Sequence, residues 1–361
     1  MSEGPNNRNI TMTSFVGKPW RPLSYDYTLN RTKFAIAAQN DRYIIVAGGY
    51  GELPRSVLVF DVETGSSALL PFLPEGSYHG SCDGTVLKDY FYLISRYGEC
   101  PAYRINLLTR KTWEKVDGNN RHYGEAVISN DTNLFLFSDH GNEAYVPQTS
   151  SWVDLPSMKK PRWAHATAIN ENKVYIIGGY DDFRHSPSSS VGVYDIQTRT
   201  WRKSPSLPRP LYGSAAAVIE KRWIIVTGGE GFDEVRSSLC FIFDIQNQKW
   251  IESEIQLSAA RSNHGCAVVG KSELVLMGGV NAFDGNVPYV ESIKISRLLN
   301  WRIIKNFILL RKLFENGQAH PIVNQDSSIS EQGSDMILQN VITQLDLDTF
   351  RHVLSFLIIS Y

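Results

Sequence analysis

The stretch Trp223-Ile224-Ile225-Val226-Thr227-Gly228-Gly229 decides the fold of this 361-residue chain. Its run of aromatic and β-branched residues predicts a short buried strand, and the two glycines predict a turn with positive φ. Apolar runs end in the same way at Gly48-Gly49, Gly178-Gly179 and Gly278-Gly279. The last three pairs in the chain are 50 residues apart, which indicates a repeated unit.

Two further copies of the strand lie between the first and second glycine pairs. Tyr90–Ile94 precedes Ser95 and Leu134–Phe137 precedes Ser138, so these copies keep the strand and replace the glycines. Successive copies then follow at steps of 47, 43, 40, 50 and 50 residues. The chain is therefore predicted to contain six units of similar length.

Other positions keep the same register within a unit. An aromatic-acid pair ends a later strand at 60–61, 194–195 and 243–244, and the sixth residue after each acid is Ser67, Trp201 or Trp250. Small residues open the units, as in 214–218, and they suit the crowded centre of a radial array. Four short strands per unit follow. The remaining units carry Trp113, Trp152 and Trp301 at the tryptophan position.

This order of apolar run, Gly-Gly, Tyr/Phe-Asp and Trp resembles the kelch repeat over about residues 31–305. The resemblance is strong at Gly178, Gly228 and Gly278 and weaker at Ser95 and Ser138. It implies the β-propeller that kelch proteins share with the central propeller of galactose oxidase. The predicted fold is all-β: a six-bladed kelch-type β-propeller with a short α-helical C-terminal appendage.

Either end of the repeat region offers a strand to close the ring. In residues 1–30, the stretch 14–24 contains Trp20, which lies 11 residues before Arg31, as Trp250 lies 11 before Arg261. Trp301–Ile304 competes for the same position, in which case the N-terminal strand would lie outside as a cover. We favour closure by the N-terminal segment.

The C-terminal part has a different composition. Apolar residues at helical spacing predict a helix over 306–323, a polar linker follows over 324–335, and an apolar helical stripe marks 336–361. This last segment is predicted to be a helix docked on the propeller. Alternatively, Leu345–Leu357 resembles the opening of an F-box, the module that attaches substrate receptors to cullin ubiquitin ligases.

Composition limits the compartment and the partners. With 36 basic and 37 acidic residues the net charge is −1, which gives no reason to expect a nucleic-acid partner. We see no secretory signal and no apolar run of membrane-spanning length, so we expect no membrane partner and a cytoplasmic or nuclear location.

Signatures of catalysis are missing from the sequence. It contains no G-x-S-x-G and no H-E-x-x-H, and its eight histidines form no clustered ligand motif. We predict no enzyme activity, no cofactor and no metal. Histidines do recur near the first strand of four units, where we expect a polar rim: His79, His122, His165 and His264.

The segments that enter the first strands are the candidate binding surface. They combine arginine with aromatic and polar neighbours, a composition typical of binding hot spots. An arginine here could instead bond backbone carbonyls between blades. Acidic residues in the loops after the second strands lie on the same face, which therefore carries both positive and negative charges. The predicted partner-binding residues are Arg31, Tyr78, Arg121, Tyr123, Arg162, Trp163, Arg209, Tyr212, Arg261, Asn263 and His264.

We therefore predict a protein-interaction scaffold or substrate-recognition module that binds an acidic peptide or protein loop on this face. Two alternatives stay open. One is a substrate receptor of a cullin-type ubiquitin ligase, attached to the ligase scaffold through the F-box-like tail. The other is a propeller enzyme that acts on sugars or alcohols, similar to galactose oxidase or to a sugar epimerase.

Overall fold

The computed structural model describes residues 20–23, 30–51, 53–75, 80–95, 102–116, 126–253, 255–270, 273–281, 285–287 and 290–295. The chain divides into two compact units, Met1–Leu298 and Leu299–Tyr361, and every described residue belongs to the first. The expected helix at 306–323, the linker at 324–335 and the segment 336–361 lie outside the described residues. In the described part, no helix is long and apolar enough to cross a membrane.

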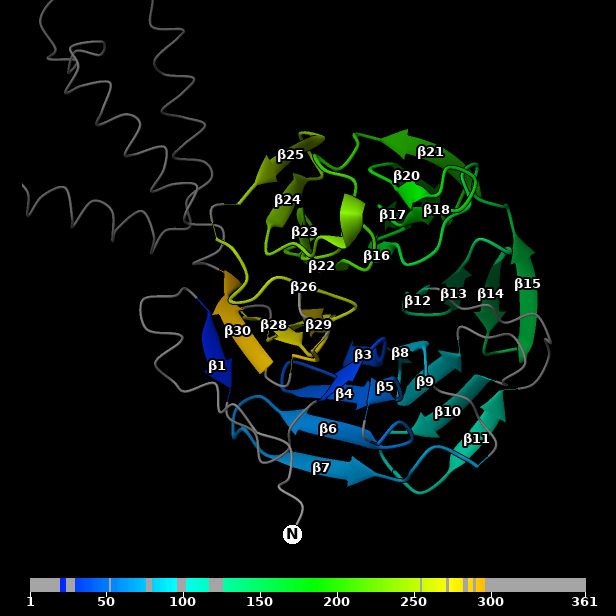
Figure 1. Cartoon of the computed structure of the whole chain (residues 1–361). Coiled ribbons are helices and arrows are strands. Elements are labelled where there is room, and N and C mark those ends of the chain that lie inside the picture. Colours follow the sequence, from blue (N-terminus) through cyan, green and yellow to red (C-terminus); the bar gives the residue numbers. More distant parts are fainter. Residues whose placement is uncertain are drawn as a thin grey trace, which may run out of the picture. The chain divides into compact units, whose positions relative to one another are not determined.

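Six four-stranded antiparallel sheets surround a common centre and form the blades of a β-propeller (Figure 1). Blade 1 contains β3 (Ala35–Ala38), β4 (Tyr43–Ala47), β6 (Val57–Asp61) and β7 (Ser67–Leu70). Blade 2 contains β8 (Cys82–Leu87), β9 (Tyr90–Ser95), β10 (Ala102–Asn106) and β11 (Trp113–Val116). Blade 3 contains β12 (Ala126–Ser129), β13 (Leu134–Phe137), β14 (Asn142–Val146) and β15 (Ser151–Leu155).

The other three blades have the same order of strands. Blade 4 contains β16 (Ala166–Asn170), β17 (Lys173–Ile177), β20 (Val191–Asp195) and β21 (Thr200–Ser204). Blade 5 contains β22 (Ala215–Ile219), β23 (Trp223–Thr227), β24 (Cys240–Asp244) and β25 (Lys249–Glu252). Blade 6 contains β27 (Gly265–Val269), β28 (Glu273–Met277), β30 (Val290–Lys294) and, as its outer strand, β1 (Arg21–Leu23).

The N-terminal strand completes the last blade. β1 pairs antiparallel with β30, with Arg21 opposite Ser292 and Leu23 opposite Val290. Trp20, directly before β1, is buried, and its indole N–H donates to the Gln256 carbonyl at 2.8 Å. The ring is therefore closed by a strand from the opposite end of the repeat region. Trp301 lies outside the described residues.

Tryptophans on or directly before the outer strands join blades 2, 4, 5 and 6 to the blade before each of them. The Trp201 indole donates to the Pro156 carbonyl at 2.8 Å, and the Trp250 indole donates to the Pro205 carbonyl at the same distance. Trp113 makes the equivalent bond to Pro71 at 2.9 Å. Trp20 makes the same kind of bond in blade 6, so one device recurs around the ring.

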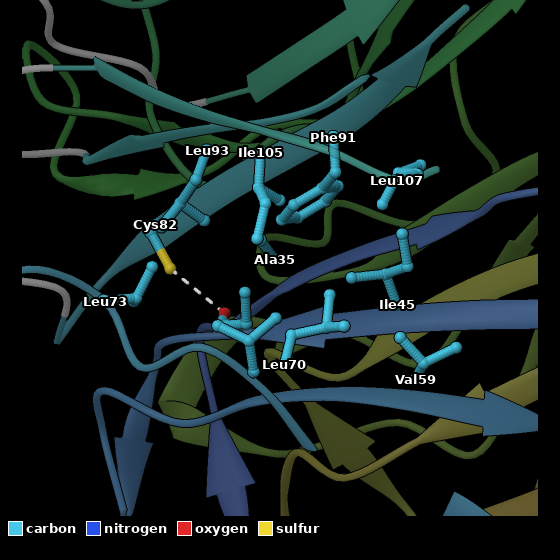
Figure 2. Packing of buried hydrophobic residues seen from close by; sticks show 12 residues of the cluster. Ala35, Ile45, Val59, Leu70, Leu73, Cys82, Phe91, Leu93, Ile105 and Leu107 are labelled. Atoms are coloured by element: carbon cyan, nitrogen blue, oxygen red, sulfur yellow. Dashed lines mark hydrogen bonds between the residues drawn. The ribbon is translucent and has the colours of Figure 1, made fainter. Parts of the chain in front are cut away.

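Apolar side chains fill the space between blades. Between blades 1 and 2, Ala35 and Ile45 face Phe91 and Leu93 (Figure 2), and the Cys82 thiol lies 3.4 Å from the Ala47 carbonyl. Blade 2 thus packs through its buried second strand although it lacks the glycine pair. The weaker repeats form complete four-stranded blades because burial of these strands does not depend on the glycines.

Candidate interaction surface

One face of the propeller is built from two kinds of segment, and we call it the loop face. Short segments that enter the first strands pair with the connections between second and third strands. β2 (Arg31–Thr32) pairs with β5 (Tyr50–Gly51) in blade 1, and β26 (Arg261–Ser262) pairs with β29 (Val280–Asn281) in blade 6. Single bridges join Trp163 to Tyr180 and Tyr212 to Glu230 in blades 4 and 5. The connections of these last two blades contain β18 (Tyr180–Asp181), β19 (Ser186–Pro187) and the 3₁₀ helix η2 (Phe232–Glu234).

The second glycine of each pair makes this pairing possible. Gly179 has φ +99°, and a Cβ placed on it would lie 2.8 Å from the Trp163 carbonyl oxygen. Gly279 has φ +93°, and its Cβ would lie 2.7 Å from the Ser262 carbonyl oxygen. Any side chain at these positions would separate the connection from the entering segment.

Residues with positive φ also join successive blades under the loop face. The Gly213 N–H donates to the Ala164 carbonyl, the Asn263 N–H to the Gly213 carbonyl and the Lys33 N–H to the Asn263 carbonyl, at 2.8 to 3.1 Å. All four residues have a left-handed backbone conformation, with φ between 47° and 63°. The last bond connects blade 6 to blade 1. Asn263, a predicted binding residue, therefore connects blades through its backbone.

Three of the predicted arginines are buried beneath the loop face. Arg31 donates to the Gly48 carbonyl at 3.1 Å and Arg162 to the Gly178 carbonyl at 2.5 Å. Arg261 reaches the Gly278 carbonyl at 3.4 Å. In each blade the acceptor is the first glycine of the pair, so arginine and glycines form one structural unit.

Each buried guanidinium has further partners. Arg261 is 0% exposed and forms an ion pair of 2.6 Å with Glu291, whose other oxygen accepts from the Ser258 hydroxyl. Arg31 donates to the hydroxyl and carbonyl of Ser56. For Arg162 all the hydrogen-bond acceptors described are backbone carbonyls, and burial lowers its pKa to about 10.

These contacts decide what the three arginines do. Their guanidiniums bond carbonyls within the blade, which is the second of the two roles considered from the sequence. These guanidiniums are not exposed to a partner at the surface, so we do not assign direct binding to Arg31, Arg162 and Arg261. Arg209 differs because it lies two residues before the corresponding position in blade 5, which Leu211 occupies. It is exposed and lies 3.8 Å from Glu252.

Two predicted aromatic residues meet on blades 4 and 5. The rings of Trp163 and Tyr212 lie 5.8 Å apart, and Tyr180 packs against both, at 4.9 Å from Trp163 and 5.4 Å from Tyr212. The Trp163 indole donates to the Asp182 carboxylate at 2.7 Å, and the Tyr212 hydroxyl donates to Glu230. These rings, which we call the aromatic cluster, are half-buried and held in fixed orientations.

Apolar side chains project from the connections beside the aromatic cluster. Phe183 is 86% exposed, Phe232 56% and Val235 65%. We call these three residues the apolar patch. On blade 1 the same kind of connection exposes Tyr50 and Leu53. The candidate binding residues from the sequence did not include these side chains, although an apolar residue between a Gly-Gly pair and the next strand is a signal that could have found them.

The two histidines of the predicted polar rim that the structure describes do not lie at the surface. His165 and His264 are buried, and the Nε2 atom of His264 lies 2.9 Å from the Thr227 hydroxyl. Burial, with a smaller effect of Arg261, lowers the pKa of His264 to about 3, so the imidazole is neutral. Both residues border a cavity of about 280 Å³ between the first strands of the six blades. Among the described residues, no group of three or more His, Cys, Asp or Glu side chains could hold a metal ion.

Several predicted residues lie outside the part of the chain that the structure describes. They are Tyr78, Arg121 and Tyr123 of the candidate binding set and the histidines His79 and His122.

Comparison with known proteins agrees with the fold. Residues 103–279 match the family model described as KLHDC2/KLHL20/DRC7 Kelch-repeats domain. Together with the six repeats and the six blades, this match defines the class of protein. The chain belongs to the kelch-repeat β-propeller family.

Known relatives match only part of the chain. Over 186 residues it is 26% identical to Kelch-like protein 36 of Bos taurus. This aligned segment covers 46% of this chain and 30% of the relative. It is 41% identical to Kelch-like protein 24 of Homo sapiens over 51 residues, 14% of this chain and 8% of the relative. The matches thus span less than a third of either relative. The solved structure described as "Structure of YjhT" shares the fold, with a TM-score of 0.62 and 14% identity over 72% of this chain and 94% of that one.

Proposed function

We propose that this protein is a protein-interaction module that binds a segment of a partner protein on the loop face of blades 4 and 5. The observation that carries the proposal is the exposure of the apolar patch on the same two connections that hold Asp182 and Glu230, the acceptors for the aromatic cluster. Large apolar side chains gathered beside half-buried aromatic rings are typical of a binding surface. Similarity to Kelch-like proteins supports an interaction module of this general kind.

Rigidity of the surface favours binding. The aromatic cluster is fixed by the bonds from Trp163 to Asp182 and from Tyr212 to Glu230. Glu230 also accepts from the Ser262 hydroxyl at 3.0 Å, which joins the connection of blade 5 to blade 6. A surface that is ordered before binding loses little conformational entropy when the partner docks.

Affinity purification tests this proposal with a matched control. A double variant, Phe183→Ser with Phe232→Ser, removes most of the apolar patch. The control is Leu108→Ser, because Leu108 is 73% exposed but lies in the turn between the third and fourth strands of blade 2, on the opposite face. We expect partners bound by wild type and by the control to be lost from the double variant. Identical partners for all three proteins would contradict the proposal.

A ligase-receptor role is a second candidate, and it rests on the F-box-like sequence Leu345–Leu357. Its residues lie outside the described part of the chain, so sequence alone supports it. Purification of cullin complexes with the full chain and with a chain ending at residue 335 tests it. Equal recovery of cullin from both proteins would remove this candidate without affecting the interaction surface.

A further inference from the structure

The two connections that carry the apolar patch also carry unequal charge. Their basic residues each lie beside an acid. Arg184 lies 3.9 Å from Asp181, and Arg236 lies 3.4 Å from Glu230 while it donates to the Asn281 carbonyl at 2.7 Å. The positive charges of these connections are therefore largely offset by neighbouring carboxylates.

Two other carboxylates of these connections have no such partner among the residues that the structure describes. Asp182 is exposed and accepts only the neutral indole N–H of Trp163 among its described hydrogen bonds. Glu234, at the end of η2, is exposed with φ +58°. Among the described residues, no basic side chain lies within ion-pair distance of either carboxylate. Within the described part of the chain, these two connections therefore carry negative charge that no basic side chain offsets.

Both carboxylates lie close to the aromatic cluster. Asp182 is bonded to Trp163. Glu234 lies in the same connection as Glu230, which accepts from the Tyr212 hydroxyl, and both charges add to burial in raising the pKa of that phenol. The negative charge and the apolar patch therefore belong to the same surface.

Much of the positive charge that the sequence suggested for this face is buried, and the exposed Arg209 lies 3.8 Å from Glu252. Arg162 and Arg261 are buried and bonded to carbonyls or to Glu291, so they cannot pair with an acidic peptide at the surface. An acidic segment would meet Asp182 and Glu234 without a cation to balance it. Repulsion and desolvation both disfavour that encounter.

We infer that the partner segment combines apolar side chains with lysine or arginine. Its apolar side chains pack on Phe183, Phe232 and Val235, and its cationic groups pair with Asp182 and Glu234. This inference rests on the proposed function, because it specifies what binds at the same surface. It replaces the acidic partner expected from the sequence with a basic, apolar one.

Selection from a random 12-residue phage-displayed peptide library tests the inference. The target is the full chain, immobilised through its C-terminus. We expect selected sequences to be enriched in Lys and Arg together with Leu, Phe or Trp. Synthetic versions of the two most frequent sequences then serve as the probes for affinity measurement against wild type and variants.

Charge-neutral variants separate the inference from the proposed function. Asp182→Asn keeps the oxygen that accepts from Trp163, and Glu234→Gln keeps the side-chain length. Together they should weaken the selected peptides about 5- to 10-fold, as expected for two exposed ion pairs, and should remove most of the salt dependence of binding. The matched control is Glu171→Gln with Glu220→Gln. These two glutamates are exposed and have a left-handed backbone conformation. They lie between the first and second strands of blades 4 and 5, on the opposite face.

The outcomes are distinct. Two results overturn the basic partner but keep the proposed binding surface. One is that the peptides fail to bind Phe183→Ser/Phe232→Ser but bind the charge variants almost as well as wild type. The other is that the selection yields acidic peptides. Peptides that still bind the apolar double variant, or a selection that yields none, overturn both the inference and the proposed function. Thermal unfolding of each variant verifies that the propeller is intact.

Discussion

A buried, neutral histidine between blades should make this propeller sensitive to acid. His264 packs with its Cε1 atom over Gly228, where a Cβ would lie 2.8 Å away, and its Nε2 atom contacts Thr227 of blade 5. In the gap between blades 6 and 1, Phe34 takes the same position over Gly278. The chain thus offers its own substitution, His264→Phe.

The size of the effect follows from the pKa of His264. In the unfolded chain the imidazole has its ordinary pKa of 6.5, whereas burial in the folded protein lowers it to about 3. The unfolded state therefore binds more protons as the pH falls below 6.5, and the folded state loses stability until the pH approaches 3. At pH 5.0 the difference favours unfolding about 30-fold, which is a loss of about 2 kcal/mol relative to pH 7.5.

Urea unfolding at pH 7.5 and pH 5.0 measures this loss in both proteins. Carboxylates titrate alike in wild type and His264→Phe, so their effects cancel in the comparison. We expect the variant to lose about 2 kcal/mol less than wild type between the two pH values. Equal losses in the two proteins would show that His264 is not the group responsible and would refute the reasoning.

Three further substitutions test the contacts that shape the loop face and close the ring, each by thermal and urea unfolding. Glu291→Ala leaves the Arg261 guanidinium buried without its carboxylate and should lower the free energy of unfolding by about 3 to 5 kcal/mol. Glu291→Gln keeps an acceptor and should lower it by less. Equal losses in the two variants would contradict a role for the charge. Trp20→Ala removes a buried ring that closes blade 6 and should lower the free energy of unfolding by about 3 to 5 kcal/mol. Trp20→Phe removes only the indole bond to Gln256 and should lower it by about 1 kcal/mol. A stable Trp20→Ala protein would mean that β1 is dispensable. Gly179→Ala should lower the free energy of unfolding by more than about 1 kcal/mol, because Gly179 has φ +99° and a Cβ there would meet the Trp163 carbonyl. Gly231→Ala is the control. A Cβ at Gly231 meets no atom closer than 3.7 Å, so this variant should have a smaller effect.

The fold could be predicted because its signals are local and repeated. An apolar run that ends in Gly-Gly, such as 223–229, specifies a buried strand and a left-handed turn without reference to any distant residue. The units at Ser95 and Ser138 were recognised by strand spacing alone, and they form complete blades because Phe91 and Phe137 are fully buried. Periodicity therefore predicted the number of blades even where the motif had changed.

The closing strand could not be decided in the same way. Trp20 and Trp301 both lie at the expected position in the repeat, and each is followed by arginine. The choice depends on the pairing of β1 with β30 and on the bond from Trp20 to Gln256, whose two residues are 236 positions apart. No local pattern contains that information.

The arginines illustrate the same limit within the site. Arg162 and Arg209 look alike in the sequence, since both precede a first strand by a few residues. Their environments differ because the acceptors of Arg162 are backbone carbonyls, which every residue has and no sequence motif marks. A shift of two residues in register is enough to leave Arg209 at the surface instead.

A buried arginine also holds one of the two connections that carry the apolar patch. Arg162 donates to the carbonyls of Gly178 and Ser190, which lie at the two ends of the connection that carries Phe183. Holding both ends of this loop fixes the base from which the exposed phenylalanine projects. In blade 5, where Leu211 replaces the arginine, Ser214 bonds the Gly228 carbonyl and Glu230 with Arg236 fixes the connection that carries Phe232. Two different sets of contacts thus give the same result, a rigid loop with an exposed apolar side chain, and this supports binding rather than packing as the role of the apolar patch.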